Sequence, residues 1–444
     1  MQRTSAFLTA TVVVVIAVVV VALVAGGGGG DGAAAGVTTS APSEPAGSST
    51  TTQPPTSTAP SSSVAPSSSV APSTTTAAPV LGGLGREDLP GDLAFITGNW
   101  LTDWSNRNID LSELKIGINT IDPRDRIVPL DGPGYETIES GNEWLIEREI
   151  GIQVDLPGGA RFYPLRILTA HEVVNDEIDV FPFAVTYCPL CNTAVAFDRT
   201  VGGEVLRFGV SGLLRKSDLV MWDDATHSLW QQITGEGIVG AHAGVQLELL
   251  PSAIVTWEDF KERHADGITL SQNTGFPFNY GSNGYVGYSN RAAPFGNFFD
   301  EEIDERFAAL ERVVGVRVGD AAKAYPFSLI SEKQTVNDEV AGVPVTVWWG
   351  DSDAADNFDG RAVGGGEAIG TGIAFLREVD GDLLTFSPVG PDTFQDAETG
   401  SVWSLLGLAT SGPLEGTQLS TALHQNEFWF AWSAFNEGSP VYGE

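Results

Sequence analysis

The two cysteines of the 444-residue chain, Cys188 and Cys191, lie three positions apart in the segment Tyr187-Cys-Pro-Leu-Cys-Asn192. Apolar and β-branched residues precede and follow them, which predicts a strand, a tight turn and a second strand, with both sulfur atoms at the turn. Two such sulfur atoms can form a structural disulfide, exchange disulfides with another thiol, or bind a soft metal ion.

A third sulfur atom in the sequence favours the metal-binding interpretation of the two cysteines. Met221 is the only methionine besides the initiator, and thiolate and thioether ligands together select copper, Cu(I) above all. His227 follows six positions later, across an expected turn, and could add an imidazole. The metal hypothesis therefore has copper as the cofactor, held by Cys188, Cys191, Met221 and His227. The alternative is that Met221 is a core side chain and His227 an exposed turn residue.

Two interpretations without a metal also stay open. Cys-Pro-x-Cys resembles the motif of glutaredoxins, but those enzymes place the first cysteine at a helix N-terminus, and the residues after Cys191 predict a strand. In an exported protein, a Cys188–Cys191 disulfide could simply brace the turn of a cell-surface structural or interaction protein. The sequence contains no Ser-His-Asp, His-Glu-x-x-His or phosphate-loop motif, so enzyme activity stays undecided.

Further residues are expected to support the site from around the cysteines. These supporting residues are Tyr187, Asn192, Asp223, Trp230 and Glu236. In a chain with 57 Asp and Glu against 23 Lys and Arg, a solvated surface position is the ordinary role of such carboxylates. The net charge of −34 argues against a nucleic-acid partner, whose phosphates would be repelled. A soft-metal or thiol partner protein is compatible with it.

The N-terminal residues 1–25 predict a signal peptide or a membrane anchor. The stretch from Phe7 to Ala25 is mainly apolar, and a single spanning helix needs about 20 such residues. Residues 26–84 begin with a glycine run and continue rich in Ser, Thr and Pro, which predicts a disordered linker. We therefore expect a membrane-anchored or secreted protein with an extracytoplasmic head and the membrane as a partner.

An internal repeat organises the head. Residues 160–187 align without a gap with residues 322–349, and nine of the 28 aligned residues are identical. A repeat of this length predicts duplicated domains. Short alternating apolar runs predict a mainly β fold, of the α+β kind with few short helices. The expected parts are a first β-rich domain at 85–270, a connecting loop at 271–310 and a second β-rich domain at 311–444.

The second repeat keeps the recurring positions but has none of the candidate ligands. The residues aligned with Cys188, Met221 and His227 are Gly350, Phe394 and Gly400. Any chemistry is therefore expected in the first repeat.

Three segments of the first repeat together resemble the domain-of-unknown-function family numbered 3179. These segments are Tyr187–Thr193, Phe208–Asp223 and Ser228–Glu236. The resemblance covers about residues 90 to 440. It implies that Cys188, Cys191, Met221, Trp230 and Glu236 match the family pattern, whereas a histidine at position 227 is not required. The family implies no activity or substrate.

Overall fold

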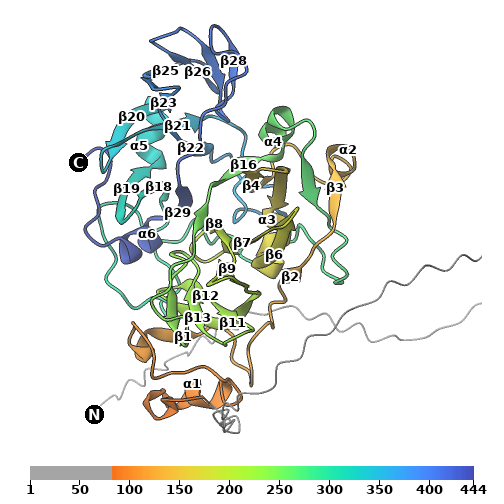
Figure 1. Ribbon diagram of the computed structural model, residues 1–444, viewed down its shortest axis with the longest axis vertical. Coiled ribbons are helices and arrows are strands. Elements are labelled where there is room, and N and C mark those ends of the chain that lie inside the picture. Colours follow the sequence, from red (N-terminus) through yellow and green to blue (C-terminus); the bar gives the residue numbers. More distant parts are fainter. Residues whose placement is uncertain (1–82) are drawn as a thin grey trace, which may run out of the picture. The chain divides into compact units, whose positions relative to one another are not determined.

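Alternating apolar residues pair as strands through much of residues 83–444, the part of the chain that the computed structural model describes (Figure 1). The fold is mainly β with few short helices, as the sequence predicts. The described residues belong to one compact unit, and no helix among them is long and apolar enough to span a membrane. The predictions for residues 1–25, and for 26–82 of the expected linker, fall outside the described residues.

A region of short elements precedes the first repeat. They are the 3-10 helices η1 (Arg86–Asp88) and η2 (Leu111–Glu113), the helices α1 (Gly91–Ile96) and α2 (Ile138–Gly141), and the strands β1 (Leu114–Ile116), β2 (Leu130–Asp131) and β3 (Tyr135–Thr137). Trp100 and Trp104 are fully buried, and their rings stack with centroids 6.0 Å apart. Burial of two such large side chains anchors this region to the head.

The first repeat builds three five-stranded sheets, which β1, β2 and β3 complete, and one two-stranded sheet. In chain order its elements are β4 (Ile150–Leu156), β5 (Gly159–Pro164), α3 (Leu165–His171), β6 (Val173–Ile178), β7 (Phe181–Cys188), β8 (Thr193–Asp198), β9 (Thr200–Val201), β10 (Glu204–Val205), β11 (Phe208–Arg215), β12 (Asp218–Asp223), β13 (Leu229–Gln231), β14 (Gly237–Val239), β15 (Leu249–Leu250), β16 (Ser252–Thr256), α4 (Trp257–Arg263) and β17 (Ile268–Leu270). The strand orders of the five-stranded sheets are β16-β4-β5-β17-β3, β15-β8-β7-β6-β2 and β1-β11-β12-β13-β14, and the two-stranded sheet is β10-β9.

The second repeat has the same order of elements, without counterparts of β15 and β17. Its elements are β18 (Arg312–Val318), β19 (Ala321–Pro326), α5 (Phe327–Lys333), β20 (Thr335–Val340), β21 (Val343–Gly350), β22 (Thr371–Leu376), β23 (Glu378–Val379), β24 (Asp382–Leu383), β25 (Phe386–Gly390), β26 (Thr393–Asp396), β27 (Val402–Ser404), β28 (Ala409–Ser411), β29 (His424–Phe428) and α6 (Trp429–Phe435). Its strand pairings repeat those of the first: β29-β18-β19 corresponds to β16-β4-β5, and β20-β21-β22 to β6-β7-β8. The four strands β25 to β28 likewise pair in the order of β11 to β14.

Residues that recur in both repeats make the same hydrogen bonds in both. The Asn175 amide bonds the carbonyl and the N–H of Phe208 at 2.7 and 2.9 Å. Asn337 does the same with Phe386, at 2.8 and 3.0 Å. An amide that uses its donor and its acceptor on one facing residue fixes where the chain enters the next sheet. These recurring residues are therefore scaffold.

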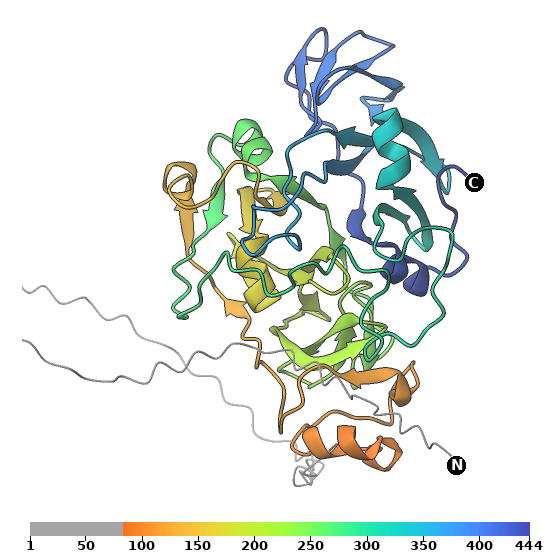
Figure 2. The same ribbon diagram turned by 180° about the vertical axis from the view of Figure 1, so that it is seen from behind.

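The connection between the repeats, residues 271–311, forms neither helix nor strand. Figure 2 shows it crossing the molecule between the end of β17 and the start of β18. Within it, Tyr288 is buried, and its hydroxyl donates to the Leu190 carbonyl at 3.0 Å. Leu190 lies between the two cysteines, so this part of the connection covers the cysteine turn.

Candidate metal site

The cysteines lie in the turn of a hairpin, as the residue pattern predicts. β7 ends at Cys188, β8 begins at Thr193, and these two residues are paired in register. Asn192, in the turn, has a φ of 55°, a left-handed conformation that asparagine adopts more readily than most residues. Both cysteines are buried, and neither is in a disulfide. The turn therefore presents two free thiols to the protein interior.

A carboxylate joins the two thiols. The sulfur atoms of Cys188 and Cys191 and a carboxylate oxygen of Asp218 all lie within 4.8 Å of one another, and all three residues are buried. No other group of three His, Cys, Asp or Glu side chains in residues 83–444 converges in this way. Two sulfur atoms and one oxygen are an acceptable partial ligand set for a thiophilic metal ion.

The turn between β11 and β12 positions Asp218. Its two central residues, Lys216 and Ser217, have φ values of 51° and 67°, the left-handed geometry of a two-residue hairpin turn that usually contains glycine or asparagine. Non-glycine residues in that region cost of the order of 1 kcal/mol each. The Ser217 carbonyl lies 3.8 Å from the Cys188 sulfur. The strained turn thus brings its backbone and Asp218 up to the cysteines.

One carboxylate oxygen of Asp218 accepts two hydrogen bonds, and the other accepts none from an N–H or O–H group of the described residues. Oδ2 accepts hydrogen bonds from the Gln231 amide at 2.6 Å and from the Ile233 N–H at 3.0 Å. Oδ1 is buried and accepts no N–H or O–H from the described residues. Burial raises the pKa of Asp218 to about 7, because it disfavours the carboxylate more than the hydrogen bonds from Gln231, Ile233 and the thiols stabilise it.

The thiols are held in their protonated form. Burial raises the pKa of Cys188, and it raises the pKa of Cys191 well above the usual range. Thiol exchange requires the opposite, a lowered pKa and an accessible sulfur. β8, not a helix, follows Cys191, so no helix dipole is available to lower the pKa. A bound metal ion would supply the missing stabilisation, since coordinating thiols are deprotonated by the ion itself.

The structure places the two other predicted ligands away from Asp218. Met221 is fully buried in the same core cluster as the cysteines, but it lies three positions after Asp218 on β12. Because side chains alternate along a strand, Met221 and Asp218 face opposite sides of β12. His227 lies beyond the far end of β12, and the five residue steps from Asp218 to Asp223 span about 17 Å.

The His227 ring is engaged elsewhere. Its Nδ1 accepts the Leu101 N–H at 3.1 Å and lies 2.8 Å from the Arg124 guanidinium. Burial, and then this guanidinium, lower the pKa of His227. The structure therefore does not bring His227 together with the cysteines.

The family model described as "Protein of unknown function (DUF3179)" matches residues 124–439. The chain belongs to this family. The match includes both repeats, and it confirms the family resemblance seen in the sequence. No curated protein and no solved structure matches the chain.

In this DUF3179 protein, two of the expected supporting residues hold the cysteine turn. The Tyr187 hydroxyl donates to Asn192 Oδ1 at 3.2 Å, across the turn. Asn357, from the second repeat, donates to the same hydroxyl at 2.7 Å. Tyr187 therefore ties the turn to both repeats.

The other three supporting residues have different roles. Asp223 Oδ2 accepts the Trp230 indole N–H at 2.9 Å. Asp396 and Trp403 make the same bond at 2.9 Å in the cysteine-free repeat, so this pair is scaffold. Glu236 is half-buried, and its carboxylate accepts the Asn108 amide.

The sequence did not reveal two carboxylates of this region, Asp218 and Glu427. Both are fully buried, although their types suggested solvated positions. One signal was available in each case. Asp218 directly precedes the apolar run Leu219–Met221, and Glu427 directly precedes the apolar run Phe428–Trp432. A charged residue directly before such a run is a candidate for a buried functional group.

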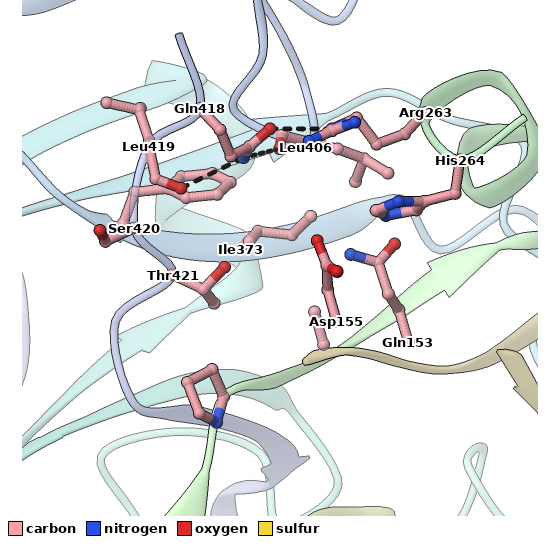
Figure 3. Close-up of a pocket in the computed structure, with 13 residues that line it drawn as sticks. Gln153, Asp155, Arg263, His264, Ile373, Leu406, Gln418, Leu419, Ser420 and Thr421 are labelled. Carbon is pink, nitrogen blue, oxygen red and sulfur yellow. Dashed lines mark hydrogen bonds between the residues drawn. The ribbon is translucent and has the colours of Figure 1, made fainter. Parts of the chain in front are cut away.

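A cavity of about 290 Å³ lies elsewhere, between residues of the two repeats (Figure 3). Figure 3 shows the Asp155 carboxylate and the Gln153 amide pointing toward the His264 ring. Across the cavity from Asp155 and Gln153, Arg263 donates to Gln418 Oε1 at 2.8 Å. Burial lowers the pKa of His264. The lining contains no cysteine and no serine next to His264, so it does not add to the thiol site.

Proposed function

We propose that this DUF3179 protein binds one thiophilic metal ion through Cys188, Cys191 and Asp218. The observation that supports the proposal is the convergence of two free thiols and one carboxylate oxygen within 4.8 Å in the buried interior. A carboxyl group buried without a cation is held toward its protonated form, at a cost in free energy near neutral pH. A metal ion would remove that cost and link the hairpins β7–β8 and β11–β12.

The choice of metal follows from charge and ligand type. The three deprotonated ligands carry a charge of −3, so Zn²⁺ leaves −1 at the site and Cu⁺ leaves −2. A larger uncompensated charge is more costly in the interior. Zinc also accepts carboxylate oxygen beside thiolate, whereas copper was favoured by a Met221 thioether that faces away from Asp218. Zn²⁺ is therefore the first candidate and Cu(I) the second.

The same features suggest a closed site for metal retention. Catalytic zinc keeps a position open to water or substrate, whereas structural zinc is enclosed by protein ligands. Here the cysteine turn is covered by Tyr288 and the ligands are buried. We therefore propose metal binding without assigning a reaction.

We further propose that residues 1–25 take the protein out of the cytoplasm, as a membrane-anchored or secreted form with residues 26–84 as a linker. Their composition is the support for this step. N-terminal sequencing of the mature protein distinguishes the two forms. A new terminus near residue 25 indicates a cleaved signal peptide, and an intact terminus with membrane association indicates an anchor. Intact protein in the cytoplasm would contradict export.

Metal analysis of the purified full-length protein tests the binding proposal. We expect about one equivalent of zinc or copper per chain, and loss of that metal in Cys188→Ser and Cys191→Ser, because a hydroxyl is a poor ligand for a thiophilic ion. Mass spectrometry after alkylation counts the free thiols of the same sample. A metal-free protein with a Cys188–Cys191 disulfide would establish the structural interpretation instead.

A further inference from the structure

We propose that Glu427, in the last strand of the second repeat, is a further ligand of the metal bound at Cys188, Cys191 and Asp218. The inference rests on the proposed metal site and adds that neither repeat can complete it alone. It is carried by the attachment of β29 to the cysteine region and by the state of the Glu427 carboxylate.

β29 is fastened to the site on both sides of Glu427. On one side, the Phe428 N–H donates to the Cys191 carbonyl at 2.9 Å. On the other, the Gln425 amide donates to the Ile233 carbonyl at 3.1 Å, and the Ile233 N–H in turn donates to Asp218 Oδ2 at 3.0 Å. Figure 1 shows β29 beside β8, the strand that leaves the cysteine turn. Glu427 is therefore held between a contact to Cys191 and an indirect link, through Ile233, to Asp218.

The Glu427 carboxylate has no hydrogen-bond partner of its own. Its side chain is fully buried, and both oxygens lack a hydrogen bond from the described residues. No salt bridge of those residues includes Glu427, although Arg317 lies on the same face of the β18–β29 pair. A buried carboxylate without donors is unfavourable unless a proton or a cation neutralises it. Two unpartnered oxygens, close enough to Cys191 for their charge to raise the pKa of that thiol, are donors that a metal ion could use.

The backbone around Glu427 leaves room for this carboxylate. Gly315 on β18 is opposite Gln425, and a Cβ atom there would overlap the Trp432 ring and would lie 3.1 Å from Glu427 Oε1, so the absence of a side chain makes room for both. Burial raises the pKa of Glu427 to about 8, although the charge of Arg317 lowers it. The charge of Asp218 raises this pKa further, so the two carboxyl groups are close enough to interact electrostatically. Glu427 lies outside the 4.8 Å group of the three other ligands, so its free carboxylate must turn toward the thiols when the metal binds.

The first repeat shows what the scaffold alone requires at this position. Val255 is the counterpart of Glu427: it pairs with Gly151 on β4, as Glu427 pairs with Val313 on β18. Val255 is fully buried, as an apolar side chain at this strand position should be. The fold therefore has no need of a carboxylate here, which favours a role in binding.

Metal affinity and the Co²⁺ spectrum of the full-length protein test the inference, with Zn²⁺ and Co²⁺ as probes. We expect Glu427→Gln to weaken Zn²⁺ binding at least tenfold, the scale seen for loss of groups at metal sites. We also expect it to change the Co²⁺ d–d bands, while the sulfur-to-metal charge-transfer band persists. Glu172→Gln is the matched control, because Glu172 is also buried, and its pKa is raised by burial and then by Asp218. This control should bind Zn²⁺ within about twofold of the unmodified protein.

The outcomes separate the two proposals. Equal effects of Glu427→Gln and Glu172→Gln would show that Glu427 acts only through its charge, and would overturn the inference. Unchanged affinity and unchanged d–d bands in Glu427→Gln would also overturn it and leave the three-ligand site intact. An unmodified protein that binds neither ion would overturn the site itself. If Glu427→Gln does not fold, Glu427→Val, which copies Val255, provides the same test. A folded Glu427→Val protein with weakened binding supports the inference, and one with full affinity refutes it.

Discussion

Replacing Asp218 by Asn should change how the stability of the metal-free protein depends on pH. The pKa of the buried carboxyl is raised from an ordinary value near 3.8 to about 7. The folded state therefore holds this proton more tightly than the unfolded chain. The stabilisation is fully present below about pH 4 and is lost as the pH rises to about 7 and slightly beyond. An asparagine side chain does not titrate, so the Asp218→Asn variant lacks this contribution.

The size of the effect follows from the two pKa values. Linkage between 3.8 and about 7 gives a loss of roughly 2 to 3 kcal/mol for Asp218 between pH 5 and pH 8. Other buried acids titrate in the same range, among them Glu172 and Glu427, whose pKa values are raised to about 8. These other acids are present in both proteins, so their contribution cancels when the stability loss of Asp218→Asn is subtracted from that of the unmodified protein. We expect the variant to lose about 2 kcal/mol less over this range.

Urea unfolding at pH 5 and pH 8, in the presence of a chelator, measures this difference. Saturating Zn²⁺ should reverse the trend in the unmodified protein, because ligands must be deprotonated to bind the ion and a rise in pH favours that step. Asp218→Asn should show little of this reversal. Equal loss of stability in both proteins between the two pH values would refute the buried, protonated state of Asp218.

Two further substitutions test the roles assigned to neighbouring residues. Met221→Leu keeps volume and apolarity, so it should cost less than about 1.5 kcal/mol in urea unfolding and leave metal affinity unchanged. A tenfold loss of Cu(I) affinity would restore Met221 as a ligand. Trp230→Phe and Trp403→Phe each remove the N–H that an aspartate accepts at 2.9 Å, and each should cost about 2 kcal/mol. Both should bind metal normally, and weakened binding in Trp230→Phe alone would contradict the scaffold role.

The hairpin that holds the cysteines could be predicted from sequence because its determinants are local. β-branched and apolar residues flank Cys188 and Cys191, and they form β7 and β8 where the pattern indicated. The repeat was visible for a similar reason. Asn175 and Asn337 must each bond both backbone groups of one facing residue, so the scaffold permits few substitutions there.

Asp218 and Glu427 could not be assigned to the cysteine site from sequence, because only tertiary contacts place them there. The chain has 57 Asp and Glu residues, and most such side chains are solvated. Asp218 follows the cysteines by about 30 residues, and Glu427 belongs to the other repeat. Nothing local indicates that β12 and β29 meet at the cysteine turn. His227 shows the converse limit, since short spacing does not set the end of a strand at which a residue lies, whereas Met221 shares the core cluster of the cysteines and its role as a ligand stays a prediction.

Two differences between the repeats occur where the repeats meet. Cys188 stands where the second repeat has Gly350, and Glu427 stands where the first has Val255, so each repeat departs from the shared scaffold on its own side. The two departures are adjacent in space, because the residue after Glu427 donates to the Cys191 carbonyl. An unpartnered buried carboxylate costs stability on its own, and here it lies at the same junction as the only two cysteines of the chain. A shared cation gives both a favourable partner, and it explains why one scaffold, used twice, carries this chemistry once.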